Sequence, residues 1–198
     1  YQHLHHIVYY PRMTRKTNST FSHLKCSKCN IKYSKTDIYN LSPCCTLPLF
    51  PQYDLEKAKS ILHKRDLKSR ESNMWRYREI MPVAFKENII SLGEGWTPLV
   101  QANRLGELKG FSNLYLKNES INPTGSFKDR GMSVAISKAK EFHLKNIAIP
   151  TAGNAGGSAA AYAAKAGQEA FIFMPNDTPK AFQVECDQYG ANVEIFDG

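Results

Sequence analysis

Strand-like and helix-like segments alternate along the second half of this 198-residue chain. Short apolar runs between turn residues predict strands, and apolar residues at three- and four-residue spacing predict helices. The expected strands span residues 113–118, 146–150, 170–174 and 192–196, and the expected helices span residues 126–142, 158–166 and 179–189. Alternation of this kind is typical of an α/β fold with a parallel sheet.

The first part of the chain divides differently. Residues 1–25 are polar and basic without periodicity, so we expect a tail, and because the first methionine is Met13 we expect residues 1–12 to lie outside the native sequence. A cysteine-bearing module follows at 26–53, and a linker expected to be helical follows at 54–85, with Asp54 as a cap. The chain ends at residue 198 directly after a predicted strand, so we expect a truncated α/β domain.

Composition places the chain among globular proteins. Hydrophobic residues make up 42% and charged residues 22%, which is enough apolar material for a core. The longest uncharged stretch, between Lys145 and Lys165, is interrupted by Pro150 and Asn154, so it does not predict a membrane span. The start of the chain lacks the apolar centre of a signal peptide. We therefore expect no membrane partner and a cytoplasmic location.

The positive charge is confined to one part. The chain carries 26 Lys and Arg against 18 Asp and Glu, and residues 1–85 hold 15 against 6, a net +9. A basic segment can bind nucleic acid, but a solvated surface is the more common explanation. The five cysteines are an odd number without a secretory signal, which favours a reducing compartment and metal or structural roles over disulfides.

Lys128 lies in the segment NPTGSFKDRG at residues 122–131. Ser126 and Asp129 have the spacing of a capping box, which predicts a helix that begins near Phe127 and places Lys128 in its first turn. The positive end of a helix dipole disfavours an ammonium group, and Schiff-base chemistry requires a neutral amine. An ordinary exposed lysine remains the alternative at this point.

Two glycine-containing loops are further candidates. The loop TAGNAGG at residues 151–157 follows a predicted strand and precedes a helix, so its N–H groups could hold an anion, although it does not match the dinucleotide or Walker patterns. The loop LGEGWTPL at residues 92–99 precedes a short apolar stretch. Both loops are also compatible with plain structural turns.

Four blocks of this sequence together resemble one enzyme family. They are MWRYREIMP at 74–82, GEGWTPL at 93–99, LKNESINPTGSFKDRG at 116–131 and AGNA at 152–155, and the later YGA at 189–191 and DG at 197–198 also fit. In order and spacing they resemble the fold-type II pyridoxal-phosphate enzymes, and threonine synthases in particular. The resemblance implies the tryptophan synthase beta-like α/β fold with its parallel sheet, in which residues 86–198 form the first half of the catalytic domain.

The resemblance also implies roles for individual residues. Lys128 would carry pyridoxal phosphate as a Schiff base and move protons on the substrate, Asn154 would hydrogen-bond the ring hydroxyl of the cofactor, and Phe127 would pack beside it. Pyridoxal phosphate would act as the electron sink. The substrate is expected to contact Thr97, Thr151, Ala152, Gly153 and Ala155.

The implied reaction converts O-phospho-L-homoserine and water to L-threonine and phosphate. In the family, the glycine-rich loop that binds the cofactor phosphate and the Ser or Thr that faces the pyridine nitrogen lie further along the chain than residue 198. Residues 1–198 alone are therefore expected to bind the cofactor weakly and to turn over no substrate. Threonine formation by these residues would contradict this expectation.

The cysteine module has the spacing of a zinc ribbon. Cys26 and Cys29 form a Cys-x-x-Cys pair, and Cys44 and Cys45 follow at ribbon separation. The resemblance implies a knuckle of this kind before the catalytic domain, with Ser42 where the second pair of the family begins. Zinc bound by all four cysteines, zinc completed by His23 or water, and a metal-free relic remain open. We expect Cys186, in a predicted helix, to be a buried structural thiol.

Other functions remain as alternatives. Within the fold these are a threonine or serine dehydratase, or another β-replacement enzyme. A zinc-ribbon nucleic-acid-binding protein is a different class, and the basic residues lack the interleaved aromatic residues that would support it. A non-catalytic paralogue is disfavoured by the presence of Lys128 and Asn154. We therefore expect a small amino-acid substrate as partner, disfavour nucleic acid, and leave oligomerisation open.

Overall fold

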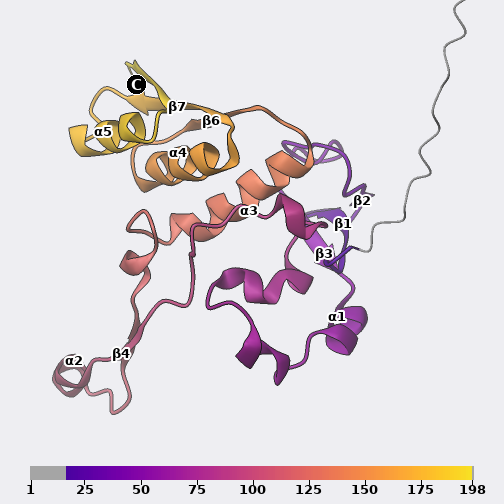
Figure 1. Cartoon of the computed structure of the whole chain (residues 1–198), viewed down its shortest axis with the longest axis vertical. Helices are drawn as coiled ribbons and strands as arrows, with labels where there is room; N and C mark the ends of the chain where they lie inside the picture. Colours follow the sequence, from indigo (N-terminus) through magenta and orange to yellow (C-terminus); the bar gives the residue numbers. More distant parts are fainter. Residues whose placement is uncertain (1–16, 198) are drawn as a thin grey trace, which may run out of the picture.

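The α/β part of the chain contains a three-stranded parallel sheet, which lies next to α4 and α5 (Figure 1). The computed structural model describes residues 17–197. Strands β6 (Asn146–Pro150), β7 (Glu169–Pro175) and β8 (Asn192–Phe196) pair in the order β6-β7-β8, with Ile149 opposite Ile172 and Ile172 opposite Val193. The predicted parallel α/β architecture is confirmed, and two of the three strands have the predicted limits.

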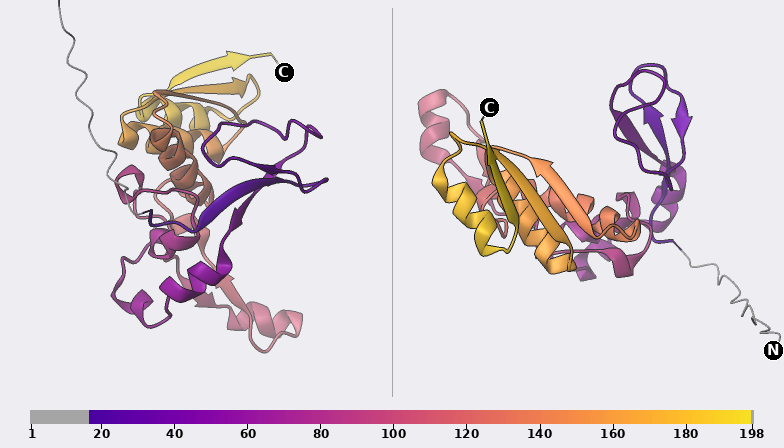
Figure 2. Two further views of the ribbon diagram at one scale, coloured as in Figure 1. Left: turned by 90° about the vertical axis from the view of Figure 1, so that its right-hand side faces the viewer. Right: turned by 90° about the horizontal axis from the view of Figure 1, so that it is seen from above.

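Three helices pack with this sheet. Helix α4 (Asn154–Ala166) contacts β7, α5 (Lys180–Gln188) and the long helix α3 (Lys128–Glu141), and α4 and α5 cover one face of the sheet (Figure 2). The alanine-rich sequence of α4 allows this close approach, and eight of its residues are buried. Its Tyr162 lies at the centre of the main core, together with Ile136 and Met174.

The starts of these helices differ from the predictions. Helix α4 begins at Asn154, four residues before the predicted start. The prediction missed this first turn because it contains glycines, which have weak helix propensity. Helix α5 begins at Lys180 with Pro179 in the N-cap position, and the Thr178 hydroxyl has no hydrogen-bond partner among the described residues. Thr178 therefore does not cap this helix.

The cysteine module is a small antiparallel sheet with the order β2-β1-β3. Its strands are β1 (Phe21–Cys26), β2 (Lys32–Tyr33) and β3 (Leu49–Tyr53). It stands apart from the parallel sheet, beside the C-terminal end of α3 (Figure 2), where Lys138 of α3 lies 5.6 Å from the Phe21 ring centroid. Residues 1–16 of the predicted tail lie outside the described residues, and residues 17–20 lead into this sheet. Residues 21–25 belong to β1, so the prediction that they are part of a tail is wrong.

The linker is helical only in short pieces. Helix α1 (Leu55–Ile61) is capped as predicted, because the Asp54 side chain accepts a hydrogen bond from Lys57 N at 2.9 Å. The 3-10 helices η1 (Asp66–Ser69), η2 (Met74–Ile80) and η3 (Lys86–Asn88) follow. Met74, Trp75 and Val83 form a second buried apolar cluster, which fixes this segment against α3.

A small antiparallel pair projects from the rest of the chain. It consists of β4 (Leu99–Gln101) and β5 (Tyr115–Lys117), joined by α2 (Asn103–Lys109), and η4 (Glu119–Ile121) follows. The predicted strand at 113–118 is thus real, but it pairs with β4 and not with the parallel sheet, because a pattern of alternating residues does not identify a strand's partner. Among the described residues, no helix is long and apolar enough to cross a membrane.

Two helical glycines provide a matched test of this packing. A Cβ atom at Gly156 would lie 2.9 Å from Thr151 Cγ2, 3.0 Å from Met174 Cε and 3.1 Å from Cys186 Sγ, whereas a Cβ at Gly131 would meet nothing within 4 Å. We expect Gly156→Ala to lower the free energy of unfolding by about 1–3 kcal/mol through overpacking. Gly131→Ala should raise it by about 0.5–1 kcal/mol, because alanine restricts the unfolded chain.

Urea unfolding of both variants measures this difference. Equal effects of the two substitutions would show that α4 does not pack as closely as described.

Candidate active site

Lys128 is the first residue of α3. Its backbone N–H donates to Ser126 Oγ at 3.2 Å, and its amine lies 4.2 Å from the Phe127 ring centroid. Within residues 17–197 the amine forms neither a hydrogen bond nor an ion pair. The predicted capping box does not form as such, because Asp129 turns elsewhere, but Lys128 lies in the first helical turn as predicted.

Asp129 fastens this turn to the neighbouring helix. Its fully buried carboxylate accepts hydrogen bonds from Thr124 N and from Ser158 Oγ, both at 2.7 Å, and from the Thr124 hydroxyl. Ser158 lies one turn after Asn154, the first residue of α4. Asp129 therefore brings the first turn of α3, with Lys128, next to the first turns of α4.

The loop at residues 151–155 leads from β6 into α4. Gly153 is the N-cap of α4, and no side chain caps the helix there. The Thr151 hydroxyl accepts a hydrogen bond from Gly153 N at 3.2 Å, and Asn154 is exposed. In parallel sheets, ligands bind beyond the carboxyl ends of the strands, and uncapped helix N–H groups bind anions. The loop, including Ala152 and Ala155, is thus placed and shaped to receive an anionic group.

Thr97 is buried in a separate polar cluster. Its hydroxyl donates to Glu119 Oε1 at 2.6 Å, and Arg130 donates to both carboxylate oxygens of Glu119, at 2.7 and 2.9 Å. Hydrogen bonding to Arg130, followed by that to Thr97 and Asn122, lowers the pKa of Glu119 to about 2. The structure shows Thr97 positioning these groups, and its contact with substrate stays a prediction.

A carboxyl group that the sequence did not single out lies behind the loop. The side chain of Glu185 on α5 occupies the place where a Cβ of Gly157 would be, with Cδ only 2.3 Å from that position. Burial raises the pKa of Glu185, and the charge of Asp129 raises it further. Nothing in the local sequence identifies this residue, because it reaches the site from a different helix.

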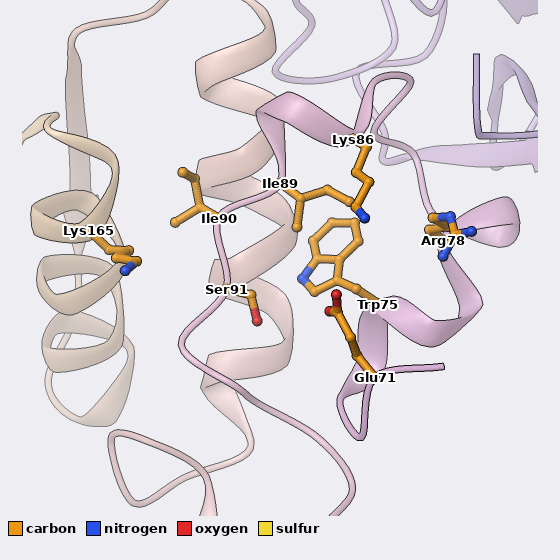
Figure 3. A pocket seen from close by; sticks show the side chains of 8 residues that line it. All are labelled: Glu71, Trp75, Arg78, Lys86, Ile89, Ile90, Ser91 and Lys165. Atoms are coloured by element: carbon orange, nitrogen blue, oxygen red, sulfur yellow. The ribbon is translucent and has the colours of Figure 1, made fainter. Parts of the chain in front are cut away.

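The pocket in Figure 3 is not this site. It has a volume of about 260 Å³, and its lining includes Trp75, residues of the segment at 86–91 and Lys165 of α4. Neither Lys128 nor the loop at 151–155 contributes to its lining.

The four predicted metal ligands do come together. The Sγ atoms of Cys26, Cys29, Cys44 and Cys45 all lie within 4.8 Å of one another, and His23 is not part of the group. Four thiolate sulfurs that each lie about 2.3 Å from one zinc ion would be separated from one another by comparable distances. A hydrogen bond with the Ser42 hydroxyl is the main reason that the pKa of Cys26 is lowered to about 6. In the metal-free cluster, hydrogen bonds with Cys29 and Cys44 raise the pKa of Cys45 to about 12, so the four thiols do not all favour the thiolate form that binds metal.

The geometry around Lys128 also suits a phosphorylated aldehyde cofactor. The amine has no competing partner, the adjacent helix start has free N–H groups, and the aromatic ring of Phe127 is exposed beside it. The protein-family model described as "Pyridoxal-phosphate dependent enzyme" matches residues 90–198.

The chain belongs to this family of pyridoxal-phosphate dependent enzymes.

Comparison with individual proteins supports the same family assignment. The chain is 40% identical over 151 residues to a threonine synthase of Methanocaldococcus jannaschii, which covers 76% of this chain and 37% of that protein. It is 40% identical over 154 residues to a threonine synthase of Methanosarcina acetivorans, with 77% and 37% covered. The chain thus spans little more than a third of these relatives. The sequence resemblance to threonine synthases is confirmed.

A solved structure shows the same fold. The apo form of Escherichia coli diaminopropionate ammonia lyase matches with a TM-score of 0.50 and 26% identity, covering 55% of this chain and 35% of that chain.

The ion pair between Glu119 and Arg130 predicts a pH-dependent stability. The pKa of Glu119 is about 2 in the folded chain against an ordinary value of 4.5, so its stabilisation is present above pH 4.5 and is lost as the pH falls toward 2. We expect Glu119→Gln to lower the free energy of unfolding by about 1–2 kcal/mol near neutral pH, because the pair is partly solvated.

Urea unfolding between neutral pH and about pH 3 tests this, with the exposed Glu107→Gln in α2 as control. The difference in the free energy of unfolding between the parent and Glu119→Gln should become smaller at low pH. A deficit that stays constant with pH would contradict the assigned cause.

Proposed function

We propose that this chain contributes the lysine-bearing part of a pyridoxal-phosphate enzyme that forms L-threonine and phosphate from O-phospho-L-homoserine and water. The observation that carries the proposal is the unpartnered amine of Lys128 beside the uncapped start of α4. The 40% identity to threonine synthases supports the choice of substrate.

Each residue has a role in this proposal. Lys128 would hold the cofactor and then remove and return protons at the α and β carbons of the substrate. Asn154 would donate to the ring hydroxyl of the cofactor, and Phe127 would cover one side of it. The N–H groups of the loop at 151–155 and the Thr151 hydroxyl would hold the substrate carboxylate. The cofactor, when bound, supplies the electron sink that makes these protons removable.

A dehydratase or ammonia lyase would share this lysine and loop. The structural similarity to an ammonia lyase at 26% identity keeps such an enzyme as the second candidate within the fold. Consumption of O-phospho-L-homoserine rather than of threonine or serine, by a protein that contains this chain, would decide between them. A cytoplasmic location and an amino-acid partner are part of the same proposal.

Lys128→Ala should abolish covalent attachment of pyridoxal phosphate. A protein that contains this chain together with the rest of the catalytic domain is incubated with limiting cofactor and reduced with borohydride, and the labelled peptide is identified by mass spectrometry. We expect Lys128 to be the main labelled residue, because its amine has no ion-pair partner among residues 17–197 and lies beside free helix N–H groups.

The control is Lys165→Ala, at the other end of α4, which should leave the labelling unchanged. Labelling spread evenly over surface lysines, with no loss in Lys128→Ala, would remove the enzyme proposal.

We further propose that the cysteine module binds one zinc ion through Cys26, Cys29, Cys44 and Cys45. The convergence of four thiols within 4.8 Å supports the proposal. The ion would link the loop after β1 to the segment before β3, and so stabilise a sheet too small to have a large core of its own.

Metal analysis after dialysis tests the zinc proposal. The parent chain should retain one zinc ion, and Cys29→Ser or Cys44→Ser should weaken zinc binding by about tenfold or more. Cys186→Ser is the matched control, because Cys186 is a buried thiol in α5 outside the cluster. Retention of zinc by both cluster variants, or a metal-free parent, would overturn the proposal.

A further inference from the structure

Arg76 carries a buried positive charge that lacks an anion. It lies in η2 and is only 6% exposed. Its Nη2 donates to the carbonyl of Leu67, but Nε and Nη1, which together carry three N–H groups, have no hydrogen-bond partner among residues 17–197. A buried charged donor without a partner is costly. The guanidinium therefore indicates that a partner of opposite charge belongs here.

The pocket beside Arg76 is positively charged. It has a volume of about 520 Å³, and its charged lining residues are Arg76, Lys117 and Arg130, without a carboxylate. Glu119 lies behind the lining and neutralises Arg130, and the Lys117 amine donates to the carbonyl of Thr97, which carries no charge. Two of the three positive charges thus remain uncompensated. A doubly charged anion would balance them, whereas a single carboxylate would not.

Trp96 forms a wall of the same pocket. Its ring centroid lies 4.2 Å from the guanidinium carbon of Arg76, yet the residue is 63% exposed. Its backbone has a φ of 53°, an unfavourable left-handed conformation for a bulky residue. The preceding Gly95 holds it there, because its N–H donates to Asn122 Oδ1 at 3.0 Å and any Cβ would lie 2.7 Å from Met74 N. Strain of this kind is typical of ligand sites.

We infer that Arg76, Lys117 and Trp96 form a binding site for a phosphate-type dianion. The anion would accept hydrogen bonds from the unpartnered N–H groups of Arg76 and lie near the Lys117 amine. The indole of Trp96 covers Arg76 and must shift to admit the anion, since Nε and Nη1 are shielded from solvent. Arginine suits this role because its fixed N–H groups match phosphate oxygens.

The proposed anion site includes neither Lys128 nor the loop at 151–155, although Lys117 and Arg130 both contact Thr97. The pocket contacts α3 through Arg130 and Val134, which lie about 200° and 240° around the helix from Lys128 at 100° per residue. Binding there does not involve the loop at 151–155. Phosphate binding at Arg76 and cofactor attachment at Lys128 are therefore measured at different residues, so failure of one proposal can be distinguished from failure of the other.

Titration with inorganic phosphate near pH 8 at constant ionic strength tests the site. The chain is labelled with ¹⁵N-arginine, and the Nε–H resonance of Arg76 is identified by its loss in Arg76→Lys. We expect a saturable shift with phosphate and no saturable shift with acetate or chloride. Lys117→Met should weaken the phosphate affinity by about tenfold or more, because one of two uncompensated charges is removed.

Arg104→Met, an exposed arginine of α2 outside the pocket, is the matched control and should bind phosphate as the parent does. The thermal midpoint provides an independent measurement, since phosphate should raise it in the parent and less in Lys117→Met. An equal response to chloride, a shift at Arg130 without one at Arg76, or unchanged binding in Lys117→Met would each overturn the inference.

Discussion

Glu94 is a fully buried carboxylate on which four segments of the chain converge. Its oxygens accept five hydrogen bonds between 2.6 and 3.1 Å, from Trp75 Nε1, Ser91 Oγ, Leu92 N, Ser133 Oγ and Tyr162 OH. Burial and the nearby Glu94 raise the pKa of Tyr162, so its hydroxyl remains a donor. A buried carboxylate is tolerated only when it is surrounded in this way, and loss of one donor would leave its charge under-solvated.

The position of Lys128 depends on this carboxylate and on Asp129. Glu94 ties α3 to α4 through Ser133 and Tyr162, about one turn further along both helices than the link that Asp129 makes to Ser158. Two buried carboxylates thus fix the same pair of helices at successive levels. The first turn of α3 cannot rotate relative to the start of α4 without breaking hydrogen bonds in the core. This rigidity holds the first turn of α3, with Lys128, next to the start of α4, as the role that we propose for Lys128 requires.

Local patterns in the sequence predicted the local elements of this structure well. The limits of strands β6 and β8 follow from apolar runs between turn residues, and the position of Lys128 in the first turn of α3 follows from the segment around it. What the sequence could not show is which distant residues meet. The predicted strand at 113–118 pairs with β4, and Asp129 bonds Ser158 instead of closing a capping box with Ser126. Both outcomes depend on tertiary contacts that no local period encodes.

The contrast between Glu94 and Arg76 explains why the anion site lies where it does. Trp75 and Arg76 are neighbours in η2, but the Trp75 indole turns inward to donate to Glu94, and Arg76 lies under Trp96. Glu94 is satisfied by five donors within the core and has no need of a cation, so the two buried charges do not pair. The positively charged Arg76 instead lines the pocket, and three of its N–H groups have no hydrogen-bond partner among residues 17–197. Glu79, the buried carboxylate of η2 itself, pairs with Arg70. The guanidinium of Arg76 is therefore available for an external anion.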